Sequence, residues 1–130
     1  MCARLFGLNQ EHVCVAALDA HDKLIKCEII EQGSGDSVRL DVRKIVDFAL
    51  KTGASAILIA HNHPSGNLLP SQKDVNMTQE AMTTLSGIGV ELQDHLIFSG
   101  SEYYSFEERG TMEKIKNIQE GLKEGIAFYE

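Results

Sequence analysis

The feature that most constrains the fold is a nearly continuous apolar run at residues 54–60, which is followed at once by His61. A short apolar run without polar alternation is typical of a strand buried on both faces, in a sheet with other layers packed against it. The strand expected at residues 12–18 has the same character, because both of its alternate sets of side chains are apolar from Val13 onward. These two segments predict an α/β domain built around a buried sheet.

Apolar spacing and turn residues place the remaining elements. Asp41 suits the position before a helix that ends at Thr52-Gly53, and Ser71 suits the start of a second helix that stops near Gly87. The order β-β-α-β-α-β-β-α predicts an α/β sandwich, a mixed sheet flanked by helices, whose first two strands form a hairpin. We expect strands at residues 12–18, 24–31, 54–60, 90–99 and 102–107, and helices at residues 42–52, 71–86 and within the tail at 111–130.

The size and composition of the chain fit one domain with an ordinary core. Its 130 residues have a hydrophobic fraction of 43%, which is enough to stay folded without disulfides. No apolar run approaches the roughly 20 residues that span a bilayer, and the start of the chain lacks a signal-peptide pattern, so we expect no membrane association. Cys2, Cys14 and Cys27 show no CxxC spacing. We interpret them as thiols of a cytoplasmic protein in a reducing compartment.

The charge of the chain argues against one class of partner. The formal net charge is −7, and the basic residues are scattered among acidic ones. A nucleic-acid binder usually carries a basic face that meets the phosphates. We therefore do not expect this domain alone to bind DNA.

Two histidines and an aspartate flank the loop after the buried strand. His61 and His63 are two residues apart, so their rings point to one side of an extended segment, which Pro64 favours. Asp74 falls in the first turn of the next helix. Two nitrogens and one oxygen make a three-ligand zinc set, with the fourth tetrahedral position left for water. The alternative is structural, because a bare His-x-His pair is weak evidence and Ser71 with Asp74 also forms a capping-box pattern.

The same stretch carries a family signature. His61-x-His63-Pro64, six further residues and then Ser71-x-x-Asp74 resemble the JAMM signature of JAB/MPN metalloproteases at every defined position. The form HNHPSG followed by Pro70-Ser71 is similar to that of RadC-type proteins. Segments at residues 24–34, 94–97 and 104–110 agree with that branch, and the resemblance covers residues 5–110.

The resemblance carries expectations about fold, domains and cofactor. It implies a JAB/MPN sandwich, similar to that of cytidine deaminases, over residues 1–110. The tail lies beyond the resemblance, and the helical spacing of its apolar residues predicts a C-terminal helical extension at residues 111–130, packed on the same domain. The resemblance implies one Zn²⁺ per chain, held by His61, His63 and Asp74 together with a bound water. RadC-like proteins usually carry an N-terminal helix-hairpin-helix region that this sequence lacks, so we expect a standalone domain or a fragment.

The resemblance also assigns two catalytic roles. It points to Glu28 as the base that takes a proton from the water, and to Ser71 as the residue that stabilises the oxyanion. Periodicity alone leaves the base open, because Glu28 also fits an exposed strand face and Glu31 and Asp36 are nearby rivals. We interpret His95, in an alternating strand, as a structural residue or as a support for the metal ligands.

Three function classes remain in competition. The first is a JAMM-type zinc metallohydrolase, a peptidase or isopeptidase that cleaves an amide bond in a protein or peptide by metal-activated water. The second is a DNA-repair associated factor of the RadC type, and the third is an interaction module that has lost its activity. The full ligand set favours the hydrolase. The apolar stripe of the tail packs on the domain or serves as a contact in a homodimer.

Overall fold

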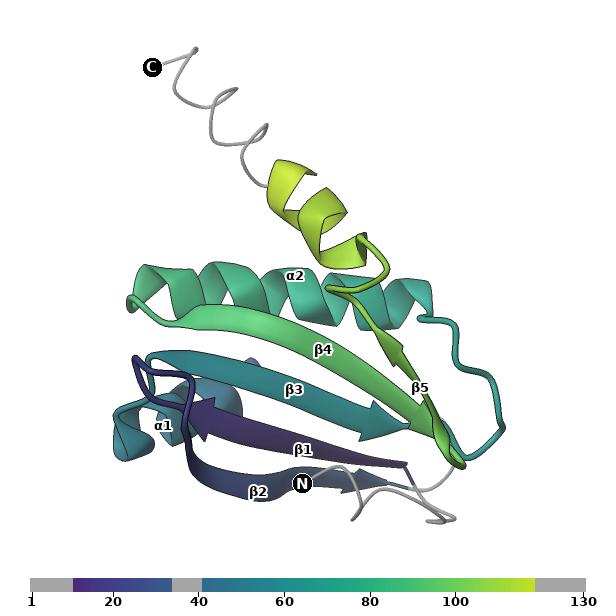
Figure 1. The fold of residues 1–130 in the computed structure, drawn as a ribbon, viewed down its shortest axis with the longest axis horizontal. Coiled ribbons are helices and arrows are strands. Elements are labelled where there is room, and N and C mark those ends of the chain that lie inside the picture. The colour runs from purple at the N-terminus through teal and green to yellow at the C-terminus, as the bar shows by residue number, and fades with distance from the viewer. Residues whose placement is uncertain (1–10, 34–40, 119–130) are drawn as a thin grey trace.

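The computed structural model describes residues 11–33 and 41–118, and these residues form a five-stranded sheet with helices packed against it (Figure 1). The strand order is β2-β1-β3-β4-β5. β1 runs antiparallel to β2 and β3, β3 runs parallel to β4, and β4 runs antiparallel to β5, so the predicted mixed α/β sheet is confirmed. The elements are β1 Glu11–Leu18, β2 Leu24–Gly33, α1 Val42–Thr52, β3 Ala56–Asn62, α2 Gln72–Gly87, β4 Glu91–Ser99 and β5 Glu102–Ser105.

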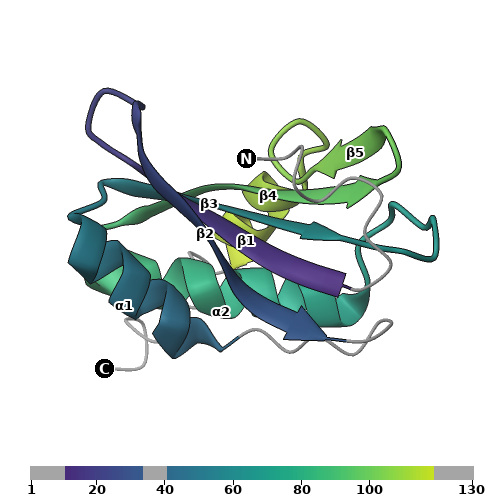
Figure 2. The same cartoon turned by 90° about the horizontal axis from the view of Figure 1, so that it is seen from below.

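The main core lies between the sheet and the helices. Helices α1 and α2 cover the same face of the sheet (Figure 2). One alternate set of side chains from each central strand faces them, and Val15 of β1, Ile57 and Ile59 of β3 are fully buried. The opposite face holds a smaller buried cluster with Cys14, Ala60 and Phe98 at its centre, together with two partly buried residues, Cys27 and Leu96. The central strand is therefore covered on both faces, as its apolar sequence predicts.

Both predicted N-caps are confirmed by the backbone and side-chain geometry. Asp41 has an extended backbone and its carboxylate accepts a hydrogen bond from the Arg43 amide. Ser71 and Asp74 form a complete capping box, in which each side chain accepts a hydrogen bond from the other residue's backbone amide. The α1 helix ends at Gly53, whose positive φ of 68° explains why glycine stands there.

Several element ends differ by one or two residues from the expectation, and two of these differences bear on the site. β3 extends through His61 and Asn62, because both residues pair with β4 and the Asn62 side chain accepts a hydrogen bond from the His12 amide. β5 ends at Ser105 rather than at residue 107, because Phe106 turns inward and its amide bonds to the His95 carbonyl. Both differences matter below, since the first puts His61 on a rigid strand and the second brings Phe106 to His95.

The tail begins with a helix at residues 111–118 that packs on the same core. Met112 and Ile115 are buried in the main cluster, whereas Ile118 is exposed. The predicted continuation through Leu122 and Ile126 lies outside the described residues. Within the described part of the chain, none of the helices has the length and apolar character needed to cross a membrane.

Candidate metal centre

Three elements bring the polar side chains together at one end of the sheet. β1 is antiparallel to β3 and pairs Val13 with His61, so the start of β1 lies beside the end of β3. Helix α2 begins after the loop that follows β3, and its first turn carries Asp74. The loop between them carries His63. The site is therefore built mostly on rigid elements, with one member on a loop.

The two histidines point at a common position, as their spacing predicts. His61 Nε2 and His63 Nε2 lie 2.9 Å apart, and the two rings meet edge to face. The other nitrogen of His63, Nδ1, lies 2.7 Å from the carbonyl oxygen of Asn67. A carbonyl can only accept, so neutral His63 carries its proton on Nδ1 and presents the lone pair of Nε2 to His61 and the site.

With Asp74, the cluster contains three side chains that can each offer a ligand atom to a metal ion. The Oδ1 atom of Asp74 lies 3.4 Å from His61 Nε2 and its Oδ2 lies 3.4 Å from His63 Nε2. The same Oδ2 accepts a hydrogen bond of 2.8 Å from the Ser71 amide. The capping box and the cluster therefore use one carboxylate at once, and the structural reading of Ser71 and Asp74 does not compete with the metal reading. The cap fixes the carboxylate so that it faces the histidines.

Glu11 is a member of the cluster that sequence reasoning missed. It is buried, and its Oε1 lies 4.0 Å from His61 Nε2. Glu11, His61 and His63 offer ligand atoms that all lie within 4.8 Å of one another. A signal was available in the sequence, since Glu11 is in phase with the buried residues Val13 and Val15 on β1. A carboxylate in phase with a buried face is expensive to bury and marks a candidate site.

Electrostatics in the cluster favour a positive charge at its centre. Burial would raise the pKa of Asp74, but the two neighbouring imidazoles outweigh it and hold the pKa well below its ordinary value. Asp74 in turn raises the pKa of His63. Burial lowers the pKa of His61. Lone pairs and a carboxylate that converge at this distance repel one another unless a proton or a metal cation lies between them.

Behind His61 lies a second buried histidine. His61 Nδ1 is 2.6 Å from His95 Nε2, and His95 Nδ1 is 2.6 Å from Thr78 Oγ1. The His95 ring stacks on Phe106 at a centroid distance of 4.6 Å. His95 and Thr78 are both fully buried, and burial lowers the pKa of His95 well below its ordinary value. His95 therefore contacts a member of the cluster directly, in keeping with the supporting role considered from the sequence.

The cluster opens onto a cavity of about 380 Å³. Residues of the loop after β3, the start of α2 and Glu11 of β1 line this cavity. The lining residues are Glu11, His63, Ser65, Asn67, Leu69, Pro70, Ser71, Lys73 and Asp74. We call this space the metal-centre cavity. It gives a solvent-borne molecule access to the buried donors.

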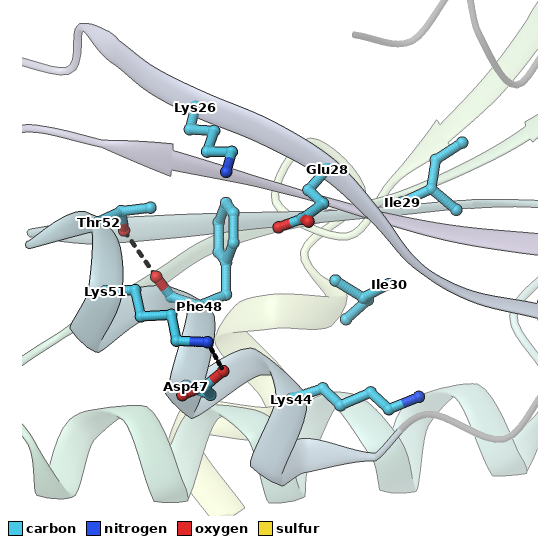
Figure 3. A pocket seen from close by; sticks show the side chains of 9 residues that line it. All are labelled: Lys26, Glu28, Ile29, Ile30, Lys44, Asp47, Phe48, Lys51 and Thr52. Atoms are coloured by element: carbon cyan, nitrogen blue, oxygen red, sulfur yellow. Dashed lines mark hydrogen bonds and ion pairs between the residues drawn. The ribbon is translucent and has the colours of Figure 1, made fainter.

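The structure does not bring Glu28 to the histidines. Glu28 lies exposed on β2, in a different cavity of about 300 Å³ (Figure 3). We call it the lysine cavity, and it is lined by Lys26, Glu28, Ile29, Ile30, Lys44, Asp47, Phe48, Lys51 and Thr52. Of the two rivals for the base, Glu31 binds Lys44 at 2.7 Å, and Asp36 lies outside the described residues. Among the described residues, the structure thus offers Glu11, and neither Glu28 nor Glu31, as the acid group beside the cluster.

Curated relatives cover most of this chain. UPF0758 protein YfjY of Escherichia coli (strain K12) is 37% identical over 109 residues, which are 84% of this chain and 68% of the relative. UPF0758 protein PSHAa2643 of Pseudoalteromonas translucida (strain TAC 125) is 41% identical over 104 residues, 80% of this chain and 46% of the relative. A UPF0758 protein of Chlorobium chlorochromatii (strain CaD3) is 35% identical over 112 residues, 86% of this chain and 50% of the relative. The chain spans about half the length of the last two relatives.

A comparison with models of protein families also identifies relatives of this chain. The model described as RadC-like JAB domain matches residues 1–111. This range includes both histidines of the cluster, Asp74, Glu11 and His95. The chain therefore belongs to the RadC-like JAB domain family.

Proposed function

We propose that this protein is a zinc-dependent hydrolase that cleaves an amide bond, as a peptidase or isopeptidase. The observation that carries the proposal is the convergence of two imidazole nitrogens and a carboxylate at separations of 2.9 and 3.4 Å, beside an open cavity. Membership in the RadC-like JAB domain family is compatible with hydrolase activity. Protein or peptide is the proposed substrate class.

The donor set fits zinc in number, type and spacing. Zn–N and Zn–O bonds of about 2.0–2.1 Å put the ligands of a tetrahedral site about 3.3 Å from one another. The separations of 3.4 Å between Asp74 and each histidine agree with that value, and the separation of 2.9 Å between the histidines is slightly shorter. Three protein donors leave one position open, which is typical of a catalytic zinc rather than a structural one.

His61, His63 and Asp74 would hold the metal, and Glu11 would act as the general base. When bound, zinc supplies a Lewis acid that polarises a carbonyl and makes water a stronger acid. Glu11 Oε1 lies 4.0 Å from His61 Nε2, farther than Asp74 does. That distance suits a carboxylate that contacts the attacking water, takes its proton and returns the proton to the nitrogen of the leaving amine.

Ser71 would stabilise the oxyanion that forms when water attacks the amide carbon. Its Oγ accepts a hydrogen bond from the Asp74 amide, so the hydroxyl's own hydrogen can be donated to another group. Ser71 lines the metal-centre cavity, so that hydrogen can be donated to a substrate oxygen held there. A donor fixed by a helix cap costs little reorganisation at the moment of reaction.

An amide is a better candidate substrate than a phosphodiester. Among the described residues, a single group of His, Cys, Asp or Glu side chains has the spacing of a metal site. Two-metal nucleases need a second site about 3.5–4 Å from the first. In the lysine cavity, two of the three lysines are paired with carboxylates, Lys44 with Glu31 and Lys51 with Asp47.

We place the reaction in the cytoplasm. The cysteines of the chain show no CxxC spacing, and free thiols are typical of proteins in a reducing compartment.

The test is hydrolysis of peptide and isopeptide libraries by the untagged, zinc-loaded protein. We expect cleavage that a chelator abolishes and zinc restores. The matched variants are Glu11→Gln, which should be inactive with its zinc retained, and Glu28→Gln, which should cleave at the wild-type rate. Cleavage that survives zinc removal would contradict the proposal, and so would full activity in Glu11→Gln.

A further inference from the structure

The hydrogen bonds behind His61 determine which of its two nitrogens can bind a metal. An imidazole that is neutral carries one proton, so either Nδ1 or Nε2 offers a lone pair, but not both. Only Nε2 of His61 faces His63 and Asp74. His61 is useful as a ligand only if its proton sits on Nδ1, and Nδ1 faces His95.

A series of hydrogen bonds connects Thr78 to His95 and His95 to His61. The donor and the acceptor of each can be assigned in turn, starting from Thr78. Thr78 Oγ1 donates its one hydrogen to the backbone carbonyl of Asp74 at 2.7 Å. Toward His95 Nδ1, at 2.6 Å, the same oxygen can then only accept. His95 therefore carries its proton on Nδ1 and donates it to Thr78.

The next link follows from the first. His95 is fully buried between α2 and the turn after β5, and stacks on Phe106, so a second proton on its ring would place an unpaired charge in the core. Its Nε2 is thus an acceptor, 2.6 Å from His61 Nδ1. His61 must donate from Nδ1, and this leaves its Nε2 with a lone pair that faces the cavity.

We infer that Thr78 and His95 are positioning residues that hold His61 in the one tautomer able to bind a metal through Nε2. The inference rests on the proposed function and deepens it, because it explains how the most buried ligand is prepared before any metal arrives. His63 reaches the same state by a simpler route, since its Nδ1 faces the Asn67 carbonyl. Different acceptors therefore determine the tautomers of the two ligands: a backbone carbonyl for His63 and a histidine ring for His61.

The test uses substitutions that separate positioning from packing. His95→Phe keeps a flat ring against Phe106 but removes the acceptor for His61. His95→Gln loses the ring but offers an amide oxygen as an acceptor. A packing role predicts that Phe is tolerated and Gln is not. The positioning role predicts the reverse for the tautomer of His61 and for metal affinity.

The first measurement is a long-range ¹H–¹⁵N correlation spectrum of the metal-free protein at pH 8, which distinguishes a protonated ring nitrogen from a bare one. We expect His61 to carry its proton on Nδ1 in the wild type and in His95→Gln, and to lose that preference in His95→Phe. Thr78→Val should shift the tautomer as well, whereas Thr78→Ser, which keeps the hydroxyl, should not. A wild-type His61 protonated on Nε2, or an unchanged tautomer in His95→Phe, would overturn the inference.

The second measurement is zinc affinity by competition with a chromophoric chelator. Loss of an acceptor that orients a metal-bound histidine typically costs about 10–100-fold in affinity. We expect a loss of that size in His95→Phe and a smaller one in His95→Gln, and equal losses in the two variants would overturn the inference. A wild type with the expected tautomer but without affinity for zinc would instead contradict the proposed function and leave the assignment of the two protons intact.

Discussion

The metal-centre cavity and the lysine cavity contain similar residue types but differ in what surrounds them. Each combines carboxylates with nitrogen bases along a strand and a helix. In the metal-centre cavity the side chains of His63 and Asp74 are 12% and 9% exposed, whereas in the lysine cavity those of Lys51 and Asp47 are 75% and 62% exposed. The first cluster is thus built into the core, and the second lies on the surface.

The difference shows why charge alone does not identify a site. Asp47 and Lys51 are exposed, lie one helical turn apart and form an ion pair with each other. Water screens their interactions with other charges. In the buried cluster the lone pairs converge on one point, and only a proton or a metal cation can satisfy them together.

The largest effect is expected from removal of a ligand. His63→Ala and Asp74→Ala should each reduce zinc from about one per chain to none, and hydrolysis to background, because two donors cannot hold the ion tightly. Metal analysis after dialysis measures this. The matched control is Asp47→Ala in the lysine cavity, which should keep its full zinc content. Retained zinc in both ligand variants would remove these residues from the site.

The next effect concerns the two candidate bases. Glu11→Gln should lower kcat by about 10²–10⁴, the usual contribution of a general base, while zinc stays bound. Glu28→Gln should leave kcat unchanged, because Glu28 lies in the lysine cavity. Steady-state kinetics on one cleavable peptide decides between them. If Glu28→Gln were inactive and Glu11→Gln active, the assignment of the base from the resemblance would be right and ours wrong.

Ser71 should show two separable effects. Loss of its hydroxyl should lower kcat by about 10²–10³ if it stabilises the oxyanion. Ser71→Ala should also lower the free energy of unfolding by about 1 kcal/mol, whereas Ser71→Gly should cost only a few tenths, since glycine is a fair N-cap. Urea denaturation and kinetics on both variants measure the two effects. A rate loss in Ser71→Ala that Ser71→Gly fails to share would show that the cap alone matters.

Acidification should weaken metal binding earlier than for an ordinary histidine. Asp74 raises the pKa of His63 in the metal-free protein, so a proton occupies Nε2 at a higher pH than the usual 6.5. Metal and proton compete for that nitrogen, and each pH unit below the pKa should lower the apparent affinity about tenfold. Zinc titrations between pH 8 and pH 5.5 measure the slope. Affinity that stays constant down to pH 6 would exclude His63 as a ligand.

The smallest effect is expected in the lysine cavity. Lys51→Gln removes the partner of Asp47 at an exposed site, where ion pairs contribute little. Neither the unfolding midpoint nor the rate of hydrolysis should change measurably. A large loss of activity in Lys51→Gln would show that this cavity takes part in the reaction and would weaken the contrast between the two regions.

Much of this contrast was accessible from sequence because local rules determine it. The apolar run before His61 predicts a buried strand, and the spacing of His61 and His63 predicts rings on one side. Ser71 and Asp74 predict a helix cap, and the cap proves to hold the carboxylate toward the histidines. Each inference depends on residues close in the chain, where backbone geometry leaves few alternatives.

The rest depends on contacts between distant segments. Glu11 reaches the cluster because β1 pairs with β3 in a particular register, and no local pattern shows that register. The resemblance pointed to Glu28, which the same sheet carries toward α1 instead (Figure 3). His95 joins His61 from a neighbouring parallel strand, and its partner Thr78 comes from α2. Residue spacing cannot reveal these contacts, because they form only when strands and helices that are distant in the sequence pack together.

Elemental metal analysis of the untagged protein tests the central claim most directly. The account predicts about one zinc per chain, either on purification or after zinc is added near neutral pH, with none in Asp74→Ala. A wild type that neither carries zinc nor takes it up would contradict the metal centre. Ser71 and Asp74 would then be a helix cap only, and the buried histidines a hydrogen-bonded part of the core.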